Sequence, residues 1–113
     1  MIMENFKSTN LFDKVMFSTI ELPSYEKLAL LYVIRYWELK SMKKVTNTPL
    51  SKFKKLMGLC NPTMIRVMSH LEEMGLITKR QNAFKMCNDY IPNIEAIMNL
   101  KTYNPITMKE EEN

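Results

Sequence analysis

The chain has 113 residues, which is enough for one compact hydrophobic core and too few for two ordinary domains. Hydrophobic residues make up 46% and charged residues 25%, with a net charge of +4, which is typical of folded globular proteins and argues against a disordered chain. The longest apolar stretch, residues 28–34, is far shorter than the roughly 20 residues that cross a bilayer, and the first ten residues lack a signal-peptide core, so we expect a cytoplasmic protein.

The first 22 residues are expected to form an N-terminal arm, in which residues 11–22 are apolar enough to pack as an arm or a short strand. A helix should follow, because Pro23 and Ser24 are start signals and Glu26 suits the first turn. We expect this helix to end at about Lys40. Its apolar residues occupy most of the circumference, so it should be covered on two sides, by the arm, by the C-terminal helix or by a second subunit.

A second, shorter helix is predicted after a polar turn. Thr48 would be its N-cap, Pro49 its first residue, and Gly58 would follow its last residue. The periodicity directs one set of side chains inward and the lysines toward water. The inward residues are Leu50, Phe53, Leu56 and Met57, and the outward ones are Lys52, Lys54 and Lys55.

A third helix should begin after a tight turn, with Asn61 as N-cap and Pro62 as first residue, and should end at Gly75. Its inward stripe is predicted to contain Met64, Met68, Leu71 and Met74, with Thr63, Ile65, Arg66, Ser69, His70 and Glu73 directed elsewhere.

Residues with strand propensity then flank a polar break at Gln81 and Asn82, which predicts a short hairpin in which residues 76–80 pair with residues 84–87. Pro92 and Asn93 open a last short helix, with Ile94, Ile97 and Met98 on one face. We expect residues 89–101 to pack on the domain or on a partner subunit, and residues 102–113 to form a flexible acidic tail.

Two capped helices joined by a tight turn and followed by a basic hairpin are the order of a winged helix-turn-helix. Residues 17–84 resemble the winged helix-turn-helix domains of phage and plasmid replication initiators, replisome organisers and small bacterial regulators, through LPSYEKLALLYVIRYW and SHLEEMGLI. The resemblance implies a mainly α fold with a small β-hairpin, in which a three-helix core and wing span residues 23–88 and an extra C-terminal helix follows. It specifies a fold more than a biological role.

In such domains the third helix lies in the major groove of double-stranded DNA, with its N-terminal residues nearest the bases. Arg66 is the strongest candidate, since a guanidinium can reach both O6 and N7 of guanine. Ile65 could meet a thymine methyl group or pack on a protein partner. The candidate base contacts are Asn61, Thr63, Ile65, Arg66, Ser69 and His70, and the candidate phosphate contacts are Lys52, Lys54, Lys55, Lys79, Arg80 and Lys85.

Charge is distributed unevenly along the chain. Residues 40–85 hold ten basic and two acidic side chains, a net charge of +8, and the remainder carries −4. This pattern is expected when one surface meets phosphate, although a solvated lysine-rich surface would look the same. The third helix itself weakens the pattern, because Arg66 is its one permanent cation and it ends in Glu72 and Glu73.

Catalysis is not indicated, because the chain has one histidine, no glycine-rich phosphate loop and no nucleophile and base at a suitable spacing. Cys60 and Cys87 stand alone, so we expect free thiols, no metal and no cofactor. Two hypotheses remain. The protein is a DNA-binding regulator or replication-initiation factor of a phage, plasmid or other mobile element, possibly as a homodimer, or it is an adaptor that docks on a replication-machinery protein with little DNA contact.

Overall fold

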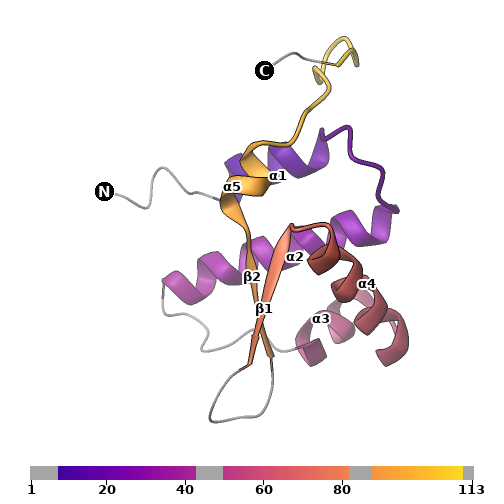
Figure 1. Cartoon of the computed structure of the whole chain (residues 1–113), viewed down its shortest axis with the longest axis vertical. Helices are drawn as coiled ribbons and strands as arrows, with labels where there is room; N and C mark the ends of the chain where they lie inside the picture. Colours follow the sequence, from indigo (N-terminus) through magenta and orange to yellow (C-terminus); the bar gives the residue numbers. More distant parts are fainter. Residues whose placement is uncertain (1–7, 43–49, 82–87, 111–113) are drawn as a thin grey trace.

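The computed structural model describes residues 8–42, 50–81 and 88–110, which form a mainly helical fold with one small antiparallel hairpin (Figure 1). This arrangement agrees with the expected class at that level. In chain order the elements are α1 (Ser8–Met16), α2 (Ser24–Ser41), α3 (Leu50–Met57), α4 (Asn61–Glu73), β1 (Ile77–Gln81), β2 (Asn88–Pro92) and α5 (Ile94–Met98). None of the described helices has the length and apolar character needed to span a bilayer.

The N-terminal segment forms a helix, α1, where an arm or a short strand was expected. Leu11 and Val15 are four residues apart, so they share one helical face, and both are buried. That face packs on α2 and α5. The buried apolar residues of this segment recur at helical spacing, and this spacing favours a helix over a strand.

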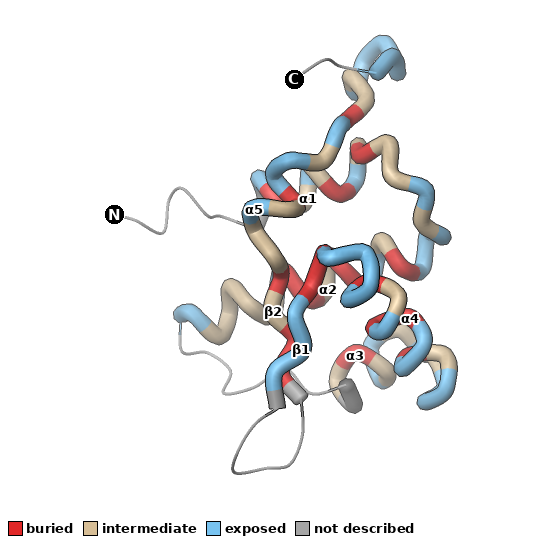
Figure 2. Tube along the Cα trace, in the orientation of Figure 1, coloured by how far each residue is buried: buried red, intermediate tan, exposed pale blue. Residues whose placement is uncertain are grey.

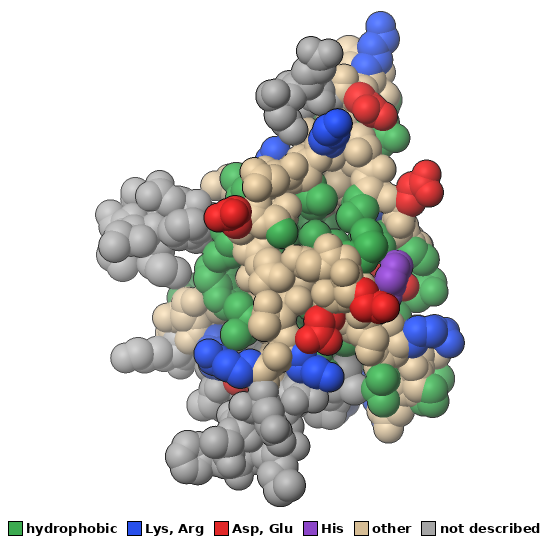
Figure 3. Space-filling model, viewed as in Figure 1, with side chains coloured by type: hydrophobic (Ala, Val, Ile, Leu, Met, Phe, Trp, Pro, Cys, Tyr) green, Lys and Arg blue, Asp and Glu red, His purple; other side chains and the backbone are tan. Residues whose placement is uncertain are grey.

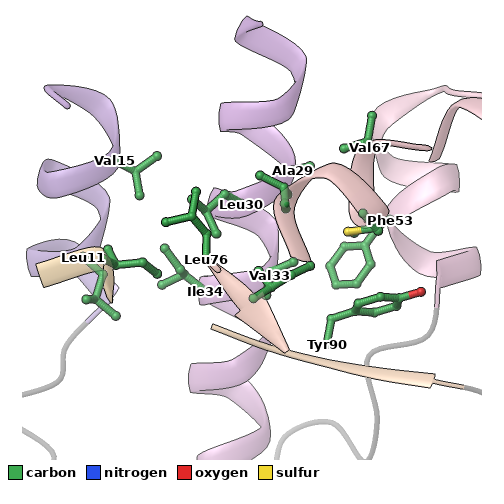
Figure 4. Packing of buried hydrophobic residues seen from close by; sticks show 14 of the residues in the cluster. Leu11, Val15, Ala29, Leu30, Val33, Ile34, Phe53, Val67, Leu76 and Tyr90 are labelled. Atoms are coloured by element: carbon green, nitrogen blue, oxygen red, sulfur yellow. The ribbon is translucent and has the colours of Figure 1, made fainter. Parts of the chain in front are cut away.

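The long helix α2 crosses the middle of the molecule, and the predicted span from Ser24 to about Lys40 is confirmed. Its buried positions Ala29, Leu30, Val33 and Ile34 lie between α1 on one side and α3, α4 and the hairpin on the other (Figure 4). Much of the apolar surface of this helix is therefore covered within the chain, whereas Tyr25 and Leu28 near its start are exposed.

Three aromatic rings join α2, α3 and the hairpin. Phe53 of α3 is fully buried and meets Tyr36 of α2 edge to face, with ring centroids 5.5 Å apart. On its other side, Phe53 meets Tyr90 of β2 at 6.1 Å. Edge-to-face contacts of this kind add roughly 0.5–1.5 kcal/mol beyond area burial. The hydrophobic core contains residues from Leu11 to Ile97, so it extends beyond the domain boundaries expected at residues 22 and 88.

Two glycines end helices in the left-handed conformation that L side chains rarely adopt. Gly58 follows α3 with φ +69°, and Gly75 follows α4 with φ +79°. After α4, the amide of Leu76 donates to the carbonyl of Leu71 at 3.0 Å, and the amide of Gly75 donates to that of Glu72 at 3.0 Å. This pair of bonds is the Schellman motif, and it confirms the predicted end of the helix.

The hairpin differs from its prediction in the second strand. Residues 77–81 pair with residues 92–88, so Ile77 faces Pro92 and Lys79 faces Tyr90. The pairing of residues 76–80 with 84–87 is therefore wrong, and residues 84–87 lie outside the described ranges. Neither stretch alternates polar and apolar residues strictly, and the contact of Tyr90 with Phe53 favours the later one.

The segment after α5 begins as part of the fold. The amide of Tyr103 donates to the carbonyl of Phe17 at 2.7 Å, and that of Thr19 donates to the carbonyl of Lys101 at 2.8 Å. Thr102 is buried and forms a bridge with Ser18. Figure 2 shows buried chain beyond α5. The expected tail at 102–113 thus starts with residues bonded to the end of α1, because strand-like pairing satisfies their backbone groups. Of the three residues expected on one face of α5, Ile97 is buried and Ile94 half-buried, but Met98 is exposed.

Candidate nucleic-acid interface

The candidate interface is built on α3, a short turn at residues 58–60, and α4 (Figure 1). Helix α4 is held by Met64, Val67, Met68 and Leu71, all of them buried. The first residue of the helix is Asn61, so its N-cap is Cys60, one residue earlier than predicted, and Pro62 is the second helical residue. The predicted inward position of Met74 is wrong, since its side chain is exposed.

The side of α4 opposite the core is exposed and carries three of the candidate base contacts. Ile65, Arg66 and Ser69 are all exposed, and their spacing places them on one helical face. Ile65 is 54% exposed, so its aliphatic side chain is available for contact from outside. We call Ile65, Arg66 and Ser69 the outer face of α4.

Next to the outer face, the N-terminus of α4 carries a thiol that the sequence reasoning did not consider as a site residue. Cys60 Sγ lies 3.2 Å from the hydroxyl oxygen of Thr63, and Cys60 is exposed. Hydrogen bonds from the side chain and backbone of Thr63 lower the pKa of Cys60, and the charge of Arg66 contributes in the same direction. The signal was present in the sequence, because N-cap and N3 residues are three apart and often bond to each other.

His70 lies beside the outer face, since it follows Arg66 by four residues on the same helix. Its Nδ1 is 2.5 Å from Oε1 of Glu26 on α2, and the Glu26 side chain is only 8% exposed. This contact ties the imidazole to α2. His70 is therefore engaged within the fold, whereas Ile65, Arg66 and Ser69 are exposed. Thr63 is half-buried and bonded to Cys60, and Asn61 is exposed.

The lysines of α3 are not equivalent. Lys55 is exposed, whereas Lys52 and Lys54 are half-buried. The ammonium of Lys52 lies 5.7 Å from the centroid of the Tyr36 ring, within cation–π range. Leu56, predicted to be inward, is 49% exposed, since Phe53 fills the core position of this helix. Lys55 is therefore the α3 cation that is most available to a phosphate.

The two basic residues of β1 lie on opposite faces of the hairpin, because successive side chains of a strand alternate. Lys79 is paired with Tyr90, whose ring packs toward α3. Arg80 is paired with Asp89, which is bound by Lys40 of α2. Lys79 and Arg80 are both exposed, but they do not lie on the same surface of the hairpin. Lys85 lies outside the described residues.

Acidic and apolar side chains border the outer face. Glu72 and Glu73 are exposed in the last turn of α4, where Glu73 follows Ser69 by one helical turn, and Leu56 is exposed on α3. Within the ranges that the structure describes, no three His, Cys, Asp or Glu side chains lie close enough to hold a metal ion. No family model, curated protein or solved structure matches the chain.

Proposed function

We propose that the protein is a winged helix-turn-helix module that binds double-stranded DNA through the outer face of α4, as a regulator or replication-initiation factor of a phage, plasmid or other mobile element. One observation carries the proposal. Helix α4 packs one side against the core and presents Ile65, Arg66 and Ser69 on the other side. In the chain it follows a short turn from α3 and precedes an antiparallel hairpin. A helix exposed in this way fits the major groove.

The arrangement of cations supports the same orientation. Lys55 on α3 and Lys79 on β1 are exposed on the elements that flank α4 in the chain, where phosphates on either side of a groove would lie. Arg66 would contact a guanine, and Ile65 would meet a thymine methyl group. His70 has no part in this proposal, because its imidazole is bonded to Glu26.

The second candidate is an adaptor that docks on another protein, and it is favoured by the exposed aliphatic side chains of Leu56 and Ile65. The acidic end of α4 also fits a protein surface better than a phosphate backbone. Helix α1 already covers one side of α2, and the apolar side chains that α2 leaves exposed near its start are Tyr25 and Leu28.

A titration of random and genomic duplexes at two or more salt concentrations separates the two candidates. Each phosphate contact releases counterions, so duplex affinity should fall steeply as salt increases. The decisive step is a selection of bound duplexes from a random pool, which tests binding and sequence preference together. Affinity that stays undetectable at low salt would overturn the DNA proposal and leave the adaptor.

A further inference from the structure

A cavity of about 220 Å³ lies between the hairpin and the last turn of α2, and no residue of α4 lines it. Figure 3 shows hydrophobic side chains gathered where α2 meets the hairpin, with Lys and Arg side chains directly below them. The cavity is lined by Trp37, Lys40, Ser41, Arg80, Tyr90 and Ile91. Aromatic and cationic side chains thus share one small space.

The charges in this cavity are arranged in a fixed way. Lys40 Nζ lies 2.9 Å from Oδ2 of Asp89, whose side chain is 6% exposed. Because a lysine ammonium has three N–H donors, this bond holds Lys40 in the wall and leaves two donors directed elsewhere. Arg80 is exposed at the opposite wall. The cavity therefore carries a positive charge beyond the Lys40–Asp89 pair.

We propose that this cavity binds a nucleotide whose base is unstacked, as in a single-stranded nucleic acid, with the base against Trp37 and the phosphate at Arg80. Aromatic rings beside cations are the surfaces on which single strands bind, because every base has a π-face and every linkage has a negative charge. The site is separate from the duplex surface proposed for α4, and it does not depend on that proposal.

Size and helix polarity set the position of the ligand. Pockets for drug-sized molecules occupy about 300–1,000 Å³, so a cavity of about 220 Å³ admits one base and leaves the sugar and phosphate outside. The C-terminus of α2 at Ser41 carries partial negative charge, which disfavours a phosphate there. The phosphate is accordingly placed at Arg80, on the strand side.

Fluorescence reports on this cavity directly, since Trp37 is the only tryptophan in the chain. The full chain is titrated at low salt with an oligothymidylate of about ten nucleotides, a length that spans one small single-strand site. Saturable quenching of Trp37 emission is expected. Arg80→Ala should weaken binding about tenfold. Because Arg80 is exposed, the variant is expected to fold like the parent chain.

The matched control is Lys101→Ala, which removes an equal charge from an exposed position after α5 that belongs to neither proposed surface. Its affinity should stay within about threefold of the parent, as expected for a general electrostatic effect alone. Equal losses for the two variants would overturn the proposal, because they would reduce the binding to general electrostatics. Equal quenching by an abasic phosphodeoxyribose strand would also overturn it.

Two further arms identify the source of the nucleotide and separate this site from α4. Quenching by thymidine monophosphate alone supports a free nucleotide, whereas quenching only by the strand supports single-stranded DNA, and quenching by neither overturns the proposal. Arg66→Ala should leave the oligothymidylate titration unchanged. If the unmodified chain does not bind duplexes but its quenching by the oligothymidylate is retained, only the proposed duplex function is contradicted.

Discussion

His70 on α4 and Glu26 on α2 are 44 residues apart in the chain, yet His70 Nδ1 lies 2.5 Å from Oε1 of Glu26. The carboxylate is nearly buried, whereas the imidazole is 39% exposed. A buried carboxylate without a partner is costly, so this contact fixes the orientation of α4 on α2. His70 therefore positions the helix that presents Arg66.

Replacing His70 by Ala should lower the free energy of unfolding by about 1–3 kcal/mol, because Glu26 would lose its hydrogen-bond partner while remaining buried. Urea unfolding measures the change. The exposed neighbour Ser69→Ala is the control and should change stability by less than about 0.5 kcal/mol. A double-mutant cycle with Glu26→Ala should give a coupling energy of about 0.5–3 kcal/mol, and additive effects would contradict the contact.

Truncation of Leu11 tests whether α1 belongs to the core. Leu11 is 1% exposed, so Leu11→Ala should destabilise the fold by about 2–5 kcal/mol through lost burial and a cavity. Met16, on the same helix, is 50% exposed, and Met16→Ala should cost less than about 0.5 kcal/mol. Similar small effects of both substitutions in thermal or urea unfolding would mean that residues 8–16 are not a structural part of the domain.

Gly75 tests the end of α4. No atom lies within 4 Å of the place where a Cβ would stand, so Gly75→Ala costs only the left-handed backbone, about 1–2 kcal/mol. Asn adopts this conformation more readily, so Gly75→Asn should cost less than Gly75→Ala. The ranking is checked by chemical unfolding. Equal losses for Ala and Asn would indicate a steric cause that the structure does not contain.

Arg66→Ala should relax the preference for one base pair in the selected duplex by about 1–3 kcal/mol, because a bidentate contact to guanine would be lost. Competition binding against single-base variants of the duplex measures this. Arg35→Ala is the charge-matched control, since Arg35 is exposed on α2 and paired with Glu38. If both variants lose affinity equally for every duplex, Arg66 contacts only phosphate or nothing.

Cys60 should react with iodoacetamide faster at neutral pH than an ordinary thiol. Its pKa is lowered, so more thiolate is present, and the rate should rise and level off at lower pH than for a free cysteine. Thr63→Val removes the first cause of the shift and should move this profile to higher pH. The reaction is followed by mass spectrometry in a Cys87→Ser background, which leaves one thiol.

Duplex binding at α4 should protect Cys60 from the same reagent, because the thiol lies at the N-cap of the helix that would enter the groove. Protection by a duplex but not by an oligothymidylate would agree with two separate surfaces. An unchanged rate at saturating duplex would show that DNA binds elsewhere.

Local signals predicted three helices well. Pro23 with Ser24 starts α2, Gly58 ends α3, and Gly75 ends α4. These signals act within a few residues of chain, through fixed proline φ and left-handed glycine, so a sequence contains them in full. The same holds for the outer face of α4, since a helical period places Ile65, Arg66 and Ser69 together.

The second strand was placed four residues too early, and the reason is physical. A strand has no bonding partner within itself, so its position depends on which side chains are buried against another element. Tyr90 packs against Phe53, 37 residues earlier in the chain, and this contact selects residues 88–92.

By itself, the sequence determined where α2, α3 and α4 end and which side of α4 is polar, because caps and periodicity are properties of neighbouring residues. The tertiary structure decided that His70 bonds to Glu26, that Lys79 and Arg80 face opposite ways, and that Trp37, Lys40 and Arg80 line one cavity. The first and third of these relationships join residues far apart in the chain, and their proximity depends on how the helices and the hairpin pack around one core. The second depends on the strand that β1 forms by pairing with β2.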